Sequence, residues 1–226
     1  MEQIPFSAGP HRSARVAIRA RNRRWACALL ALLSMHTGPA TSGSPDVEAA
    51  EARLNHWRAL ILEGRGADQT AQLTAVNDFF NGAHFVDDRE LWQTSDYWAT
   101  PDEFLRLDAG DCEDFAIAKY FTLKAMGVAP EKLRITYVKV TSMAQAHMVL
   151  AYYETPESEP LILDNLNRRI KPASERADLR PLYSFNAETL WLARSRREQQ
   201  EAGHPGQLQR WREMVARLDP GLLGNL

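Results

Sequence analysis

Cys112 is the residue of this chain best suited to act as a nucleophile. It stands in the segment Gly110-Asp111-Cys112-Glu113-Asp114, in which Gly110 breaks the preceding element and Asp111 is a good helix N-cap. The pattern predicts that Cys112 opens a helix at its first position. The unpaired N–H groups and the positive dipole end found there favour a thiolate, which is the reactive form of cysteine.

A cysteine nucleophile needs a base, and few histidines are suitably placed. Four of the six lie in a predicted leader, an amphipathic helix or a linker: His11, His36, His56 and His204. Of the other two, His84 lies in a turn-rich loop, whereas His147 begins the apolar run 148–153, which is typical of a strand. We therefore predict that His147 is the general base.

Asp164 is the predicted third member of this group. It follows the short apolar run 161–163, and the turn-like connection 154–160 predicts that the two strands are antiparallel neighbours. Asp164 could then approach the His147 ring and fix its tautomer while the other ring nitrogen faces Cys112. The sequence does not set the register of this hairpin.

Three carboxylates surround the predicted nucleophile, namely Asp111, Glu113 and Asp114. Nearby negative charges raise the pKa of a thiol and so oppose the thiolate. One account is helix capping by Asp111 and Asp114, with the His147 imidazolium as counter-ion, and spacing alone favours it because acidic first turns are common. The other account adds Ca²⁺, which binds oxygen ligands and would lock the helix start.

The N-terminal residues 1–40 have the pattern of a secretory signal. Six arginines precede the apolar stretch 25–33, which is too short to span a bilayer comfortably, and Gly38-Pro39-Ala40 supplies small residues for cleavage. Cleavage would remove the six arginines and Glu2, so the net charge would fall from −2 to −7. It would also remove Cys27 and leave Cys112 as the only thiol, which predicts a free nucleophile in an exported protein.

The acidic balance of residues 41–226 argues against nucleic acid as a partner. The remaining basic cluster is short and is expected to be a solvated helix face: Arg194, Arg196 and Arg197. We expect 41–226 to form one domain with its own core.

Apolar spacing predicts helices over 47–63 and 70–81, then the Cys112 helix, strands from 133 onward and a terminal helix over 207–218. Helices followed by an antiparallel sheet indicate the α+β class. Between them, a turn-rich segment is expected to be a solvated loop rather than a metal site, although it carries His84, Asp87, Asp88 and Glu90. The rings of Trp92, Tyr97 and Trp98 are expected either to wall the cleft or to pack in the core.

Three segments resemble the bacterial transglutaminase-like cysteine proteinases, and among them the periplasmic proteases that process adhesins. They are Gly-Asp-Cys-Glu-Asp-Phe-Ala at 110–116, Ala-His-Met-Val-Leu at 146–150 and Leu-Asp-Asn at 163–165. The resemblance extends from about Val76 to Asn186. It implies a papain-like or transglutaminase-like fold, in which N-terminal helices and a catalytic cysteine at a helix N-terminus pack on an antiparallel sheet.

The resemblance also carries functional expectations. It implies a periplasmic, calcium-dependent endopeptidase with Cys112, His147 and Asp164 as its triad, and it turns the preference at Asp111, Glu113 and Asp114 from capping to Ca²⁺ binding. The implied substrate is the N-terminal region of a large surface adhesin, cut at an alanine pair. The implied partner is an inner-membrane receptor that senses cyclic di-GMP and sequesters the protease. Two alternatives stay open: transglutaminase-type acyl transfer and a binding module without catalysis, against which the intact Cys, His and Asp argue.

Overall fold

Two long helices open the described part of the chain, as the apolar spacing predicts. α1 spans Pro45–Gly64 and α2 spans Gln69–Phe80, with Asp68 as the N-cap of α2. The computed structural model describes residues 45–142, 146–193 and 199–219. The predicted signal segment and the arginine cluster at 194–197 lie outside these described residues.

Short elements connect α2 to the nucleophile helix. β1 (His84–Phe85) pairs in parallel with β2 (Ala109–Gly110), and α3 (Asp88–Leu91) and α4 (Pro101–Leu107) lie between them in the sequence. Thr100 and Glu103 form a capping box at the start of α4, as the Thr-Pro-Asp-Glu pattern indicates. α5 (Cys112–Ala125) follows β2 directly, so the pairing of β1 with β2 fixes the point at which α5 begins.

The second half of the described chain forms a seven-stranded antiparallel sheet of order β6-β5-β4-β3-β7-β8-β9. Its strands are β3 (Leu133–Val140), β4 (Ala146–Tyr152), β5 (Leu161–Leu163), β6 (Lys171–Pro172), β7 (Leu179–Phe185), β8 (Leu190–Ala193) and β9 (Gln199–Gly203). Short 3₁₀ helices lie at Pro130–Lys132, Ala173–Glu175 and Pro205–Gln207. β9 was not predicted from the sequence, and the terminal helix α6 (Gln209–Val215) is shorter than the predicted 207–218.

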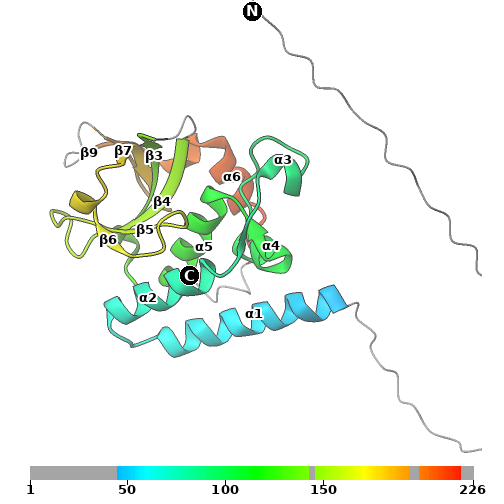
Figure 1. Ribbon diagram of the computed structural model, residues 1–226. Helices are drawn as coiled ribbons and strands as arrows, with labels where there is room; N and C mark the ends of the chain where they lie inside the picture. The colour runs from blue at the N-terminus through cyan, green and yellow to red at the C-terminus, as the bar shows by residue number, and fades with distance from the viewer. Residues whose placement is uncertain (1–44, 143–145, 194–198, 220–226) are drawn as a thin grey trace, which may run out of the picture. The chain divides into compact units, whose positions relative to one another are not determined.

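α5 lies at the centre of the fold, between α1 and α2 on one side and the sheet on the other (Figure 1). Its buried side chains, among them Ile117, Tyr120 and Leu123, pack in the main core together with Ile135 and Leu150 of the facing strands. A smaller apolar cluster lies on the other face of the sheet. This arrangement is the predicted α+β fold with the cysteine at a helix N-terminus packed on an antiparallel sheet. In the described residues, no helix is both long enough and apolar enough to cross a membrane.

Candidate active site

Cys112 is the first residue of α5, and the local sequence holds this helix start in place. The Asp114 carboxylate accepts the Asp111 N–H at 3.1 Å and the Ala99 N–H at 2.7 Å. It therefore ties the helix start to the preceding loop. Gly110 is required by close approach, because a Cβ there would lie 2.6 Å from Asp114 Oδ2. Cys112 thus projects from a rigidly anchored helix end.

His147 and Asp164 form a buried hydrogen bond, with 2.8 Å between Nε2 and Oδ1. His147 is only 3% exposed and Asp164 only 1%. The register of β4 and β5 explains the contact. Leu150 pairs with Leu163, the last paired residue of β5, so Asp164 comes next and lies toward the end of β4 that contains His147. This is the antiparallel approach that the sequence predicts, with the register now given.

Asp164 has two further partners that keep it ionised. The Leu166 N–H donates to Oδ1 at 2.9 Å, and Arg176 Nη2 lies 2.7 Å from Oδ2. Arg176 is in turn paired with Asp178. Burial by itself raises the pKa of Asp164, but the hydrogen bond and charge of His147, the Leu166 N–H and Arg176 lower this pKa to about 2. Asp164 is therefore a carboxylate that can orient and stabilise a His147 imidazolium.

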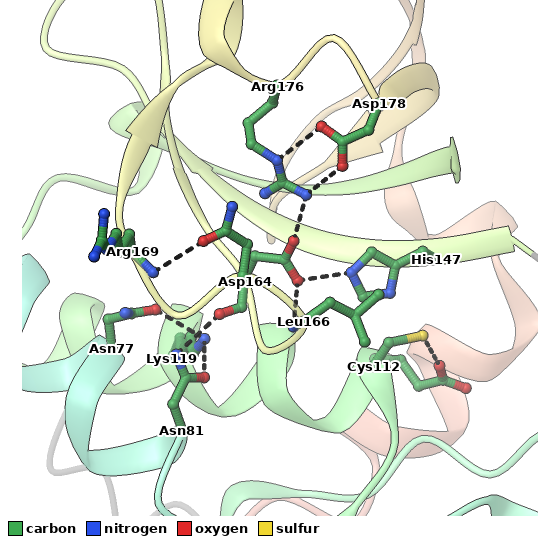
Figure 2. A network of polar contacts seen from close by, with 12 residues as sticks. Asn77, Asn81, Cys112, Lys119, His147, Asp164, Leu166, Arg169, Arg176 and Asp178 are labelled. Carbon is green, nitrogen blue, oxygen red and sulfur yellow. Dashed lines mark hydrogen bonds and ion pairs between the residues drawn. The ribbon is translucent and has the colours of Figure 1, made fainter. Parts of the chain in front are cut away.

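The Cys112 thiol lies beside this pair. In Figure 2 the second ring nitrogen of His147 is on the side of Cys112, while Nε2 points to Asp164. The thiol donates to Glu113 Oε2 at 3.1 Å. Burial raises the pKa of Cys112, and the charges of Glu113 and Asp111 raise it further, so the thiol form is favoured in this arrangement.

A cluster of carboxylates adjoins the nucleophile and is larger than the sequence predicts. The ligand oxygens of Asp88, Asp111 and Asp114 lie within 4.8 Å of one another, and so do those of Asp88, Asp96 and Glu113. The expectation that Asp88 belongs to a solvated loop is wrong: this residue is 2% exposed and its Oδ2 accepts the Tyr97 N–H. The segment folds back so that Asp88 faces the start of α5.

The donor set of this cluster fits a hard divalent cation. Asp88 Oδ1 and Asp111 Oδ1 are buried and have no hydrogen-bond partner among the described residues. Burial raises the pKa of Asp111 to about 9, and the charge of Glu113 adds to this effect. Burial likewise raises the pKa of Asp88. Buried carboxylates that repel one another and have free oxygens are suitable ligands for Ca²⁺. Asp114 is less suitable, because both of its oxygens already accept backbone N–H groups.

Of the two expected roles of the predicted aromatic residues, the structure shows core packing, because Trp92 and Tyr97 pack against the core to which Trp98 belongs. Trp98 belongs to the core, where it stacks on Phe185, while Trp92 and Tyr97 are half-buried and stack on each other at 4.3 Å. A second half-buried pair, which the sequence analysis did not single out, is formed by Tyr137 and Tyr183 at 5.0 Å. Burial raises the pKa of Tyr137, and negative charge on Cys112 or Glu113 raises it further.

Some residues of the site had no usable local signal. Arg176 stands in a loop, and nothing in its neighbourhood predicts burial. Asp96 lies eight or more residues along the chain from the other acids of the cluster, so only folding shows that it joins them. Lys119 did carry a signal, because its helical spacing from Phe115 and Thr122 places it on the buried side of α5.

Comparison with known proteins assigns the class. Residues 58–183, more than half of the chain, match the family model described as bacterial transglutaminase-like cysteine proteinase. The chain belongs to the bacterial transglutaminase-like cysteine proteinase family and is a cysteine protease. No match is found among the curated proteins.

Solved structures of LapG from Legionella pneumophila are similar to this chain. EGTA-treated LapG is 46% identical over 75% of this chain and 90% of that chain, with a TM-score of 0.69. A second LapG structure has the same identity and coverage with a TM-score of 0.68. Calcium-bound LapG is 45% identical over 76% of this chain and 92% of that chain, with a TM-score of 0.67. The fold and the protease class of the present chain are thus those of a LapG-like protein.

Proposed function

We propose that this protein is a calcium-dependent periplasmic endopeptidase that cuts the N-terminal region of a large surface adhesin. The observation that carries its catalytic part is the position of Cys112 at the start of α5, beside a buried His147–Asp164 pair with 2.8 Å between Nε2 and Oδ1. A nucleophile, a base and a residue that orients the base are thus present in one place.

The proposed mechanism assigns one step to each group. His147 takes the proton of Cys112, and the thiolate attacks the peptide carbonyl carbon. The Cys112 backbone N–H, one of the first N–H groups of α5 and so without a partner inside the helix, donates to the developing oxyanion. The imidazolium then protonates the leaving amine, and water hydrolyses the thioester with His147 again as base. Asp164 holds the ring and stabilises its positive charge throughout.

Glu113 must release the Cys112 thiol before the reaction can start. Its carboxylate now accepts the thiol proton of Cys112 at 3.1 Å, which competes with proton transfer to His147. The residues that would hold Ca²⁺ are Asp88, Asp96, Asp111 and Glu113. Asp114 would not be a ligand but would keep the helix start in place, because its carboxylate accepts the Ala99 and Asp111 N–H groups. A bound Ca²⁺ supplies positive charge that offsets these carboxylates beside the thiolate. The calcium-bound and EGTA-treated LapG structures support calcium binding as such, while the choice of these four residues rests on the carboxylate cluster of the present chain.

The substrate, the location and the regulatory partner are proposed from the family resemblance. The signal pattern of residues 1–40 supports export to the periplasm. A protease that acts there can reach the N-terminal region of an adhesin retained at the cell surface. A receptor in the inner membrane that senses cyclic di-GMP would control adhesin release by sequestering the protease.

Cleavage of a purified N-terminal fragment of a surface adhesin from the same bacterium tests the proposal. The wild-type protein should cut the fragment in Ca²⁺, and EGTA should stop the reaction until Ca²⁺ is added back. Cys112→Ala should be inactive but folded. A fluorescent primary amine added to the reaction should not be incorporated into the fragment, since incorporation would indicate acyl transfer instead of hydrolysis. An uncut fragment in Ca²⁺ would refute the adhesin assignment.

A further inference from the structure

A lysine is buried beneath the proposed triad. Lys119 lies on α5 two turns after Cys112 and is 1% exposed. Its Nζ donates to Asn77 Oδ1 at 3.0 Å and to Asn81 Oδ1 at 2.8 Å, both on α2. An apolar residue at this inward-facing position would avoid the cost of burying an amine, so stability alone does not explain why a lysine stands here.

The two asparagines also donate hydrogen bonds to the loop that contains Asp164. Asn81 Nδ2 donates to the backbone carbonyl of Asp164 at 2.9 Å (Figure 2). Asn77 Nδ2 donates to the backbone carbonyl of Arg168 at 2.7 Å. Lysine offers only donors, so it requires the oxygen of each amide to face it and directs each NH₂ group toward the loop. The amine thereby sets which way both side-chain amides point.

We propose that Lys119 and Asn81 form a positioning clamp that holds Asp164 in hydrogen-bonding distance of His147. This inference rests on the proposed role of Asp164 in orienting His147. The clamp connects α5, which begins with Cys112, to the backbone of the residue that orients the base. It therefore fixes the nucleophile's helix and the His147–Asp164 pair relative to each other.

The protonation of Lys119 is compatible with this role. Burial lowers the pKa of Lys119 to about 7, while the charges of Asp164 and Asp78 act in the opposite direction. An uncharged amine still has two N–H groups, one for each asparagine oxygen. The clamp therefore persists in both protonation states.

Matched variants separate the clamp from general stability. Asn81→Asp keeps an oxygen for Lys119 but removes the N–H that reaches Asp164. Asn77→Asp makes the same change one helical turn away, where the lost N–H reaches Arg168. Lys119→Met removes the amine with little change in length. Thr122→Val is the control for a lost buried hydrogen bond. Thr122 lies on α5 like Lys119, and its hydroxyl accepts from Trp57 Nε1, but it has no contact with Asp164.

Two readouts are needed. The first is kcat and KM for cleavage of the adhesin fragment: Asn81→Asp and Lys119→Met should lower kcat about 10- to 100-fold with little change in KM, because a supporting partner is lost and the catalytic geometry loosens. Asn77→Asp should cause a smaller decrease, and Thr122→Val should leave kcat near the wild-type value. The second is the low-field proton NMR signal of the His147 Nε2–H, which should shift or broaden in the first two variants and stay in place in Thr122→Val.

The outcomes distinguish the clamp from the proposed function. If Asp164→Asn cleaves like the wild type, the proposed role of Asp164 fails. If Asp164→Asn is impaired but Asn81→Asp and Lys119→Met keep both kcat and the Nε2–H signal, the triad stands and the clamp is refuted. An equal loss of kcat in Thr122→Val would also refute it, since the effect would then follow from stability.

Discussion

Arg176 and Asp164 form a buried ion pair in which Nη2 lies 2.7 Å from Oδ2. Removal of Arg176 leaves Asp164 Oδ2 buried without its cation, and His147 and the Leu166 N–H compensate only at Oδ1, so the cost is about 3 kcal/mol. Arg176→Met should therefore lower the free energy of unfolding by about 3 kcal/mol in urea denaturation. Arg180→Met, which removes an exposed arginine of the neighbouring strand β7, is the control and should have little effect. Equal stabilities of the two variants would contradict the prediction.

The stability that Asp164 contributes should depend on pH. Its pKa is about 2 in the folded protein and about 3.9 in an unfolded chain. Because the folded value is the lower one, this contribution is fully present above about pH 4 and is lost as the pH falls toward 2. The difference in unfolding free energy between the wild type and Asp164→Asn should thus be smaller at pH 3 than at pH 5. A difference that stays constant down to pH 3 would rule this out.

Gly110 should not tolerate a side chain. A Cβ there would lie 2.6 Å from Asp114 Oδ2 and 2.7 Å from the Phe104 ring. Asp114 is held in the anchored start of α5, and Phe104 is fully buried on α4. Gly110→Ala should lower stability by about 1–3 kcal/mol through overpacking. Gly64→Ala is a matched control, since its Cβ would meet Met126 Sδ at the same 2.6 Å, but this flexible side chain can move away. Melting temperatures of the two variants test the difference.

Asp88 should contribute to calcium binding although it lies far from Cys112 in the sequence. It is buried in the acidic cluster, and its Oδ1 has no hydrogen-bond partner among the described residues. Asp88→Asn should weaken Ca²⁺ binding at least about tenfold in calorimetry, because a charged oxygen ligand is lost. It should also reduce the rise in melting temperature that Ca²⁺ produces. Asp87→Asn removes the same charge from an exposed position and should bind Ca²⁺ almost like the wild type.

Much of the fold could be predicted because its signals are local. The Gly-Asp-Cys-Glu-Asp segment contains its own cap and first turn, so the start of α5 at Cys112 followed from the sequence. His147 and Asp164 were expected to meet because a turn-like connection joins their strands, and only the register had to come from the structure. β9 escaped prediction because Gln199–Gly203 is polar and lacks strand periodicity. It is a strand because the edge of β8 offers backbone partners.

The residues that support the site were harder to predict, since their roles depend on distant contacts. Asp88 was expected to be solvated because its neighbours are turn-forming and acidic, but the fold brings it to Asp111. Arg176 is buried only because Asp164 and Asp178 accept from it. Lys119 lies at helical spacing from Phe115, which is consistent with burial, but its asparagine partners lie on another helix.

The parallel pairing of β1 with β2 has a consequence for how a cation would be captured. Phe85 pairs with Gly110, and the Val86 N–H donates to the Gly110 carbonyl at 3.0 Å, so the intervening segment is a closed loop in the folded chain. The entropic cost of bringing Asp88 close to Asp111 is therefore incurred during folding and not during cation binding. A cation would meet oxygens that are already gathered, and its association rate should be set by the loss of its hydration water and not by ordering of the backbone.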